Sequence, residues 1–167
     1  MPVTQVDKDP DRLTMTVHSE FKAGPDRIWQ MWEDARLLER WWGPPTHPAT
    51  FEQHDLSPGG GMKYFMTGPD GDRFRGWWRV ISVQPKSSIE IEDGFADQDG
   101  NPDPSMASMI MKVSIEQAEH DPGTTLMTIE TSFQSLEAME QVLEMGAEEG
   151  MTLAQGQIDE MLASGAA

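Results

Sequence analysis

The chain has 167 residues, the usual length of one domain with a substantial hydrophobic core. Its 29 Asp and Glu outnumber its 12 Lys and Arg, which leaves a net charge of −17. Because nucleic-acid binding requires basic side chains that neutralise phosphates, this charge excludes such partners. The 37% of hydrophobic residues exceeds what a disordered acidic chain contains, yet no apolar run reaches the ~20 residues that span a bilayer. We therefore expect a soluble globular protein with no membrane partner.

The absence of cysteine excludes disulfides, a thiol nucleophile and thiolate metal ligands. The first residues lack the basic and apolar segments of a secretory signal, so we predict a cytoplasmic protein. Acidic residues are unevenly spread: residues 1–86 have a net charge of −1, whereas residues 87–167 have a net charge of −16. We interpret the second half either as a well-solvated face or as a docking surface for a cationic partner.

The first third of the chain predicts one strand and two short helices. Residues 1–11 are polar and irregular and are predicted as a flexible N-terminal lead, with residues 12–167 forming a single domain. Apolar and polar residues alternate over residues 13–23, which is typical of a strand with one buried face. A proline in the first turn favours a short helix over residues 25–32, and a second short helix over residues 34–42 ends at a Gly-Pro-Pro sequence.

The middle of the chain alternates with a period of two between turn-forming sequences rich in Gly, Pro, Asp and Ser. This pattern predicts six further strands over residues 51–56, 62–67, 73–83, 88–95, 106–117 and 124–133. Ser135 can then cap one long helix that reaches about Ala163 and packs one face while exposing an acidic one. Gly146, Gly150 and Gly156 lie inside that helix and predict a kink or a close approach to another element.

A sheet of seven antiparallel strands must have its apolar face covered, and the terminal helix is the only predicted element long enough to cover it. The expected fold class is α+β: a seven-stranded curved antiparallel sheet wrapped around a long C-terminal helix, with two short helices after the first strand. Such an arrangement can enclose an apolar cavity between the sheet and the helix.

The element order and four sequence stretches are similar to those of a known superfamily. The stretches are residues 35–44 (ARLLERWWGP), 56–60 (LSPGG), 68–71 (GPDG) and 143–151 (LEMGAEEGM). The chain resembles the SRPBCC (START-like, helix-grip) superfamily, in particular its branch of homologues of the activator of the heat-shock-protein-90 ATPase. The resemblance extends over residues 12–163 and implies the helix-grip fold.

The resemblance implies a small protein that holds a hydrophobic or amphipathic small molecule in its cavity. Two alternatives stay open: a stress-related protein that activates a chaperone ATPase, and a cavity enzyme acting on a polyketide-like or aromatic substrate. For the enzyme, Tyr64, His54 or Glu130 would supply the acid or base. The oligomeric state is left open, with a homodimer as one alternative.

Strand alternation predicts which side chains face the helix, and these include many of the 13 methionines, whose flexible thioethers suit an adaptable pocket or an irregular core. The inward faces are residues 62, 64 and 66; 74, 76, 78 and 80; 109, 111, 113 and 115; and 127, 129, 131 and 133. The predicted ligand-binding residues are Trp29, Trp41, Tyr64, Met66, Trp78, Met111, Met127, Phe133 and Gly150. Consecutive indoles on a short helix cannot both point inward, so one of the Trp41–Trp42 pair, with Trp41 as the residue to test, is predicted to face the cavity mouth, either as a gate or as a hydrophobic plug with no ligand.

Other motifs predict no cofactor, no metal and no catalytic residue. The acidic loop over residues 97–103 lacks the spacing of an EF-hand calcium loop, and the four histidines have no partner at metal-ligand spacing. Arg73, Arg75 and Arg79 share the outer face of their strand and are expected to pair with Glu90 and Glu92 of the next one.

Overall fold

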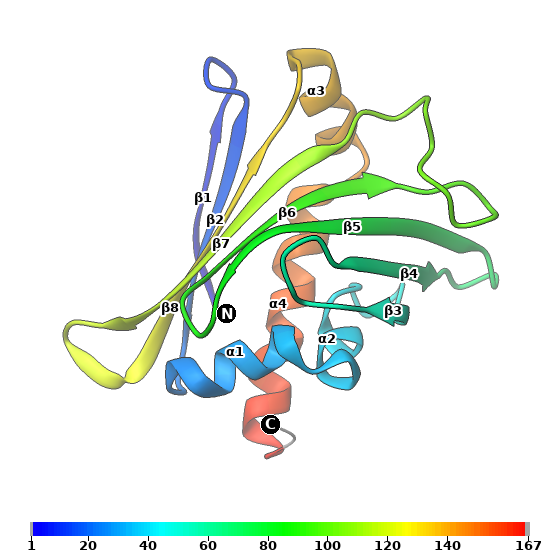
Figure 1. Ribbon diagram of the computed structural model, residues 1–167. Coiled ribbons are helices and arrows are strands. Elements are labelled where there is room, and N and C mark those ends of the chain that lie inside the picture. The colour runs from blue at the N-terminus through cyan, green and yellow to red at the C-terminus, as the bar shows by residue number, and fades with distance from the viewer. Residues whose placement is uncertain (1, 166–167) are drawn as a thin grey trace.

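The computed structural model describes residues 2–165, in which one curved antiparallel sheet surrounds a helix (Figure 1). The strands run β1 Val3–Asp9, β2 Thr14–Phe21, β3 Ala49–His54, β4 Gly61–Thr67, β5 Arg73–Gln84, β6 Ser88–Phe95, β7 Met109–Ala118 and β8 Asp121–Ser132. The helices are α1 Pro25–Glu33, α2 Ala35–Trp41, α3 Leu136–Glu144 and α4 Ala147–Ala163. This is the predicted α+β helix-grip architecture with eight strands instead of seven.

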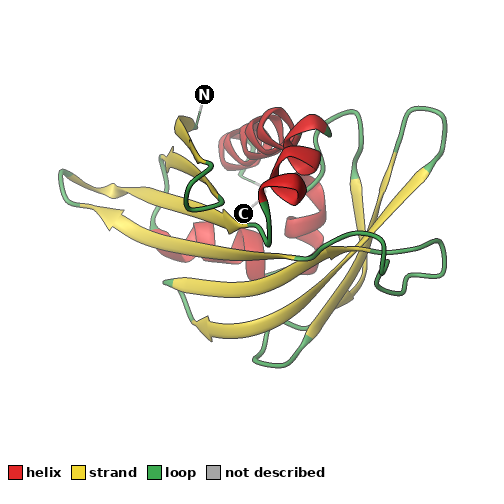
Figure 2. Cartoon of the chain, turned by 90° about the horizontal axis from the view of Figure 1, so that it is seen from above, coloured by secondary structure: helices red, strands yellow, loops and turns green. Residues whose placement is uncertain are grey.

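The strand order is β1-β2-β8-β7-β6-β5-β4-β3, and every neighbouring pair is antiparallel. The last strand therefore joins the N-terminal hairpin to the β3–β7 meander. The helices lie within the curve of the sheet (Figure 2). Met62, Trp78, Val113 and Ile129 are buried beneath them, as their alternation predicts.

The eighth strand corrects the prediction of an irregular lead over residues 1–11. Residues 3–9 form β1, which pairs with β2 from Val3 opposite Ser19 to Asp9 opposite Thr14. Only Val3 and Val6 of this edge strand are apolar, so backbone pairing rather than burial of alternate side chains holds it, and no period of two marks it in the sequence. Residue 1 of the predicted lead and residues 166–167 of the predicted domain lie outside the described residues.

The two short helices start where their first residues predict. Pro25 occupies the first turn of α1, where its missing N–H costs no hydrogen bond. The Asp34 carboxylate caps α2 by accepting hydrogen bonds from the backbone N–H groups of Arg36 and Leu37. Both helices bury their apolar faces against one end of the sheet, beside α4.

The predicted single helix over residues 135–163 is wrong, because the chain breaks it into α3 and α4. Ser135 caps α3 as predicted, accepting a hydrogen bond from the Ala138 N–H. At Gly146 the backbone takes φ +87°, a left-handed conformation that ends one helix and starts the next. The kink expected from three glycines is therefore at Gly146, while Gly150 and Gly156 lie within α4.

The convex face of the sheet is polar and ion-paired. Arg79 pairs with Glu92 at 2.8 Å, as expected from neighbouring strands, whereas Arg75 pairs with Glu52 of β3 at 2.9 Å instead of with β6. The Arg73 guanidinium lies 4.3 Å from the centre of the Phe65 ring. Within residues 2–165, no helix is both long enough and apolar enough to cross a membrane.

Candidate functional site

A cavity of about 530 Å³ lies between the concave face of the sheet and the elbow that joins α3 to α4. This volume is within the range of sites for drug-sized ligands. The sheet and the residue after it contribute Met15, Tyr64, Met66, Phe74, Asp93, Gly94, Phe95, Met109, Met111, Thr131 and Phe133. The helices and the segment after α2 contribute Trp42, Pro44, His47, Val142, Met145, Gly146, Ala147, Gly150 and Met151. The wall is therefore built mainly of methionine and aromatic side chains.

The helix elbow keeps this space open. Because α3 turns away at Gly146, the first turn of α4 faces the sheet with small residues, Ala147 and Gly150. A Cβ atom built on Gly150 would have no other atom within 4 Å. A larger side chain at this position would therefore enter the cavity.

The segment after α2 borders the cavity and is held tightly. A Cβ atom on Gly43 would lie only 2.0 Å from the backbone carbonyl oxygen of His47, so only glycine fits there. The Gln157 side chain of α4 donates a hydrogen bond of 2.6 Å to the Gly43 carbonyl. The His47 ring packs 5.6 Å from the ring of Phe74, which is 55% exposed. Alternation predicts that Phe74 faces inward; the second residue of β5, it borders the cavity and also remains exposed.

Among residues 2–165, Asp93 is the one carboxyl group that lines the cavity. It lies on β6 two residues beyond Ile91, on the face that points toward the helices, and it is directly opposite Trp78 of β5. Desolvation by the surrounding protein raises the pKa of Asp93 from 3.8 to about 7, and the nearby Trp78 indole N–H partly opposes this rise. The Asp93 side chain is half-buried and borders the mainly apolar cavity, so the carboxyl group is desolvated although it is not fully covered.

Tyr64 supplies a second polar group. Burial, and secondarily the neighbouring Asp93 charge, raises the pKa of Tyr64, which therefore stays a neutral phenol. The indole N–H groups of Trp42 and Trp78 lie close enough to the hydroxyl to oppose that rise, but neither makes a hydrogen bond of normal geometry within the described part of the chain. The Trp42 and Trp78 rings pack edge to face at 4.7 Å.

The structure brings five of the nine predicted ligand residues together in the cavity wall: Tyr64, Met66, Met111, Phe133 and Gly150. The other four lie in the hydrophobic core instead. Trp29 donates to the Glu33 carboxylate at 2.6 Å, Trp41 donates to the Met31 carbonyl at 2.9 Å, and Trp78 is buried behind Trp42. The Met127 sulfur lies 3.4 Å from the Trp32 indole nitrogen. Trp78 and Met127 face the helices, as strand alternation predicts, whereas Trp29 and Trp41 lie on α1 and α2 themselves, and all four belong to the larger part of the core.

The position predicted for the gate also needs correction. Trp41 is fully buried, and its neighbour Trp42 is the indole that lines the cavity. Consecutive helical residues point about 100° apart, so one of the pair had to face elsewhere, but the sequence does not indicate which. Asp93 was not predicted, although alternation with Ile89 and Ile91 on β6 places it on the inward face.

Of the three acid–base residues considered for an enzyme, only Tyr64 borders the cavity. The His54 ring lies 2.9 Å from the Trp32 carbonyl oxygen, outside the cavity. Glu130 is on the opposite face of β8 from the cavity residue Thr131. Among residues 2–165, no group of three His, Asp or Glu side chains could hold a metal ion.

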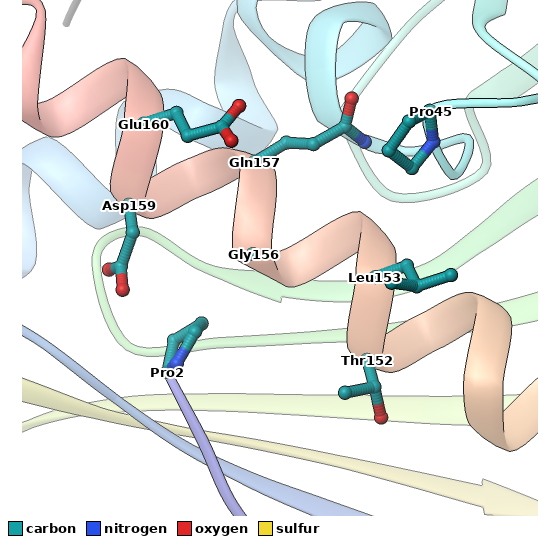
Figure 3. Close-up of a pocket in the computed structure, with 8 residues that line it drawn as sticks. All are labelled: Pro2, Pro45, Thr152, Leu153, Gly156, Gln157, Asp159 and Glu160. Atoms are coloured by element: carbon teal, nitrogen blue, oxygen red, sulfur yellow. The ribbon is translucent and has the colours of Figure 1, made fainter.

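A second, smaller hollow of about 300 Å³ lies along residues 152–160 of α4 (Figure 3). Its wall is formed by Pro2, Pro45 and α4 residues that include Gly156 and the carboxylates of Asp159 and Glu160. A Cβ atom on Gly156 also has no other atom within 4 Å. Gly150 and Gly156 thus lie on the same helix and face different hollows, which makes them a matched pair for mutagenesis.

Comparison with known proteins identifies the family. The family model described as "Activator of Hsp90 ATPase homolog 1-like protein" matches residues 22–163. The chain belongs to this family. No curated protein matches it.

Solved structures of similar proteins show the same fold. Protein Ms6760 from Mycobacterium smegmatis is 45% identical with a TM-score of 0.89, over 96% of this chain and 97% of that one. A protein from Arthrobacter aurescens is 46% identical with a TM-score of 0.91, over 97% and 92% of the two chains. A protein from Staphylococcus epidermidis at 23% identity has a TM-score of 0.82, over 96% and 94%, and supports the fold alone. Membership of the Hsp90 ATPase activator homologue family fits a small ligand-binding protein with this cavity.

Proposed function

We propose that this protein binds an apolar or amphipathic small molecule in the cavity between its sheet and the α3–α4 elbow. The observation that carries the proposal is the cavity itself: about 530 Å³, walled mainly by methionine and aromatic side chains, with the Asp93 carboxyl group among them. Methionine side chains adapt to ligands of different shape because their three torsions are soft. An apolar ligand would gain free energy from the area it removes from water.

Native mass spectrometry of the untreated protein tests this proposal directly. A bound molecule is expected as an added mass that is released on denaturation. A thermal-shift panel of lipophilic compounds complements it, because a ligand at about 100 times its Kd raises the free energy of unfolding by about 2.7 kcal/mol. No added mass together with no stabilising compound would contradict the proposal.

The variant Gly150→Leu tests whether the ligand binds in this cavity. The leucine side chain would enter the open space above Gly150 and exclude the ligand. Gly156→Leu is the matched control, since it adds the same side chain to the same helix but faces the smaller hollow. Loss of the added mass in the first variant and its retention in the second are expected. Equal retention in both would place the ligand elsewhere.

The chaperone-activator alternative rests on the family description and on the carboxylates that α3 exposes, Glu137, Glu140 and Glu144. It is tested by adding the protein to a purified chaperone of this class and measuring ATP hydrolysis. Under the binding proposal the hydrolysis rate stays unchanged. A salt-sensitive increase in that rate would favour the alternative, because exposed charges are screened by salt.

A further inference from the structure

Given the proposed binding function, the polar groups of the cavity indicate what kind of head group the ligand carries. Among the lining residues, all within the described part of the chain, there is no Lys or Arg, and His47 is the one basic side chain. A carboxylate or phosphate head group would therefore enter this cavity without a strong counter-ion. Burying an unpaired charge is costly, so fatty acids and phospholipids are disfavoured.

The indole N–H donors do not compensate for the missing cations. The Nε1 atoms of Trp42 and Trp78 are buried near the Tyr64 hydroxyl, and that of Trp78 is also near Asp93, but a neutral N–H group carries no full positive charge. What the wall does present to a ligand is the Asp93 carboxyl group, for which the described residues provide no ion-pair partner.

The surroundings of Asp93 suit a cation. Trp42 and Tyr64 border the same cavity, and aromatic ring faces attract an ammonium group that lies over them. The whole chain has a net charge of −17, so its long-range field attracts cations and repels anions. The local carboxyl group and the global field thus favour the same sign of ligand charge.

We propose that the ligand is an amphipathic amine whose ammonium group pairs with Asp93 while its apolar body lies among the methionine side chains of the cavity. The proposal rests on the proposed binding function and adds a head group to it. A neutral alcohol and an acid with the same apolar body are the competing classes.

Three probes with one apolar body distinguish these classes: naphthylethylamine, naphthylethanol and naphthylpropionate, each titrated calorimetrically into the intact protein at about pH 8. At that pH Asp93 is mostly ionised, because its pKa is about 7. The amine is expected to bind about tenfold or more tighter than the alcohol, and the acid more weakly than either. Asp93→Asn should reduce amine affinity to the level of the alcohol and leave the alcohol unchanged. Asp70→Asn, in an exposed turn, changes the net charge equally and should have no effect.

The pH dependence in the unmodified protein gives a second measurement. Protonation of Asp93 competes with the ammonium group, so amine affinity should fall toward that of the alcohol at about pH 5.5, a loss of about tenfold, while alcohol affinity stays constant. His47 and Tyr64 are the other titratable side chains that border the cavity, and Tyr64 remains neutral throughout. The same pH dependence in His47→Gln assigns the effect to Asp93.

Two results would overturn the amine proposal. Equal binding of the amine and the alcohol would do so and would leave the proposed binding function intact. An Asp93→Asn variant with undiminished amine affinity would place the ammonium group elsewhere. If none of the three probes binds, the amine assignment fails, and native mass spectrometry of the untreated protein then decides the binding function independently.

Discussion

Replacing Asp93 with Asn tests whether this carboxyl group destabilises the unliganded protein. The pKa of Asp93 is about 7 in the folded chain against an ordinary value of 3.8, which corresponds to about 4 kcal/mol of differential stability. Between pH 4 and 7 the folded state holds a proton that the unfolded state has already lost. The stability of the unmodified protein relative to the variant therefore falls as pH rises through this range and is constant above it.

Urea unfolding of both proteins at pH 4, 5, 6, 7 and 8 measures this difference. We expect Asp93→Asn to be more stable by up to about 4 kcal/mol at pH 8 and nearly equal at pH 4, where both side chains are neutral. The other acidic residues contribute equally to both proteins and cancel in the difference. Asp70→Asn should follow the unmodified protein at every pH. Two results would refute the assignment of a desolvated carboxylate. One is a difference in the free energy of unfolding between the two proteins that does not change with pH, and the other is an Asp93→Asn variant that is less stable than the unmodified protein at pH 8.

Three further substitutions test the frame around the cavity by urea or thermal unfolding. Gly43→Ala should destabilise the protein by about 3 kcal/mol or more, because its Cβ would lie 2.0 Å from the His47 carbonyl oxygen; a loss under 1 kcal/mol would contradict this tight turn. Trp41→Ala should lower the free energy of unfolding by about 3–5 kcal/mol, because removal of the fully buried ring leaves a void and leaves the Met31 carbonyl without its hydrogen bond. A loss of stability under about 1 kcal/mol would instead support Trp41 as a gate. Asp34→Ala should cost about 1 kcal/mol through loss of the α2 cap, and an unchanged stability would mean that the cap contributes nothing.

The sequence predicts the inward face of the sheet well because a period of two is a local property of each strand. Met111 and Trp78 are both buried on the side of the helices, as alternation requires. Alternation cannot predict that Met111 borders the cavity while Trp78 is buried behind Trp42. That difference depends on where α2 and α4 cross the sheet, which is a property of distant segments.

The break between α3 and α4 and the edge strand β1 could not be predicted from the sequence, for two different reasons. Three glycines in one predicted helix indicate a weak helix, but only tertiary packing selects Gly146 for the left-handed turn. Residues 3–9 form a strand through backbone pairing with β2, and their side chains show no period of two. Alternation along β6 places Asp93 on the inward face of the sheet. The sequence does not show that its carboxyl group borders the same cavity as Trp42 and Tyr64.

The cavity separates two parts of the hydrophobic core. Trp42, Tyr64 and Met111 belong to the larger part, around α1, α2 and most of α4, whereas Met15 and Phe133 belong to the smaller part beneath α3. The left-handed turn at Gly146 lets α3 cover the smaller part without filling the space between the two. A ligand in the cavity would contact both parts at once and replace missing protein contacts on each side. Ligand binding should therefore protect the backbone amides of both parts from hydrogen exchange, including amides of β2 and α3 that are far from the Asp93 carboxyl group along the chain.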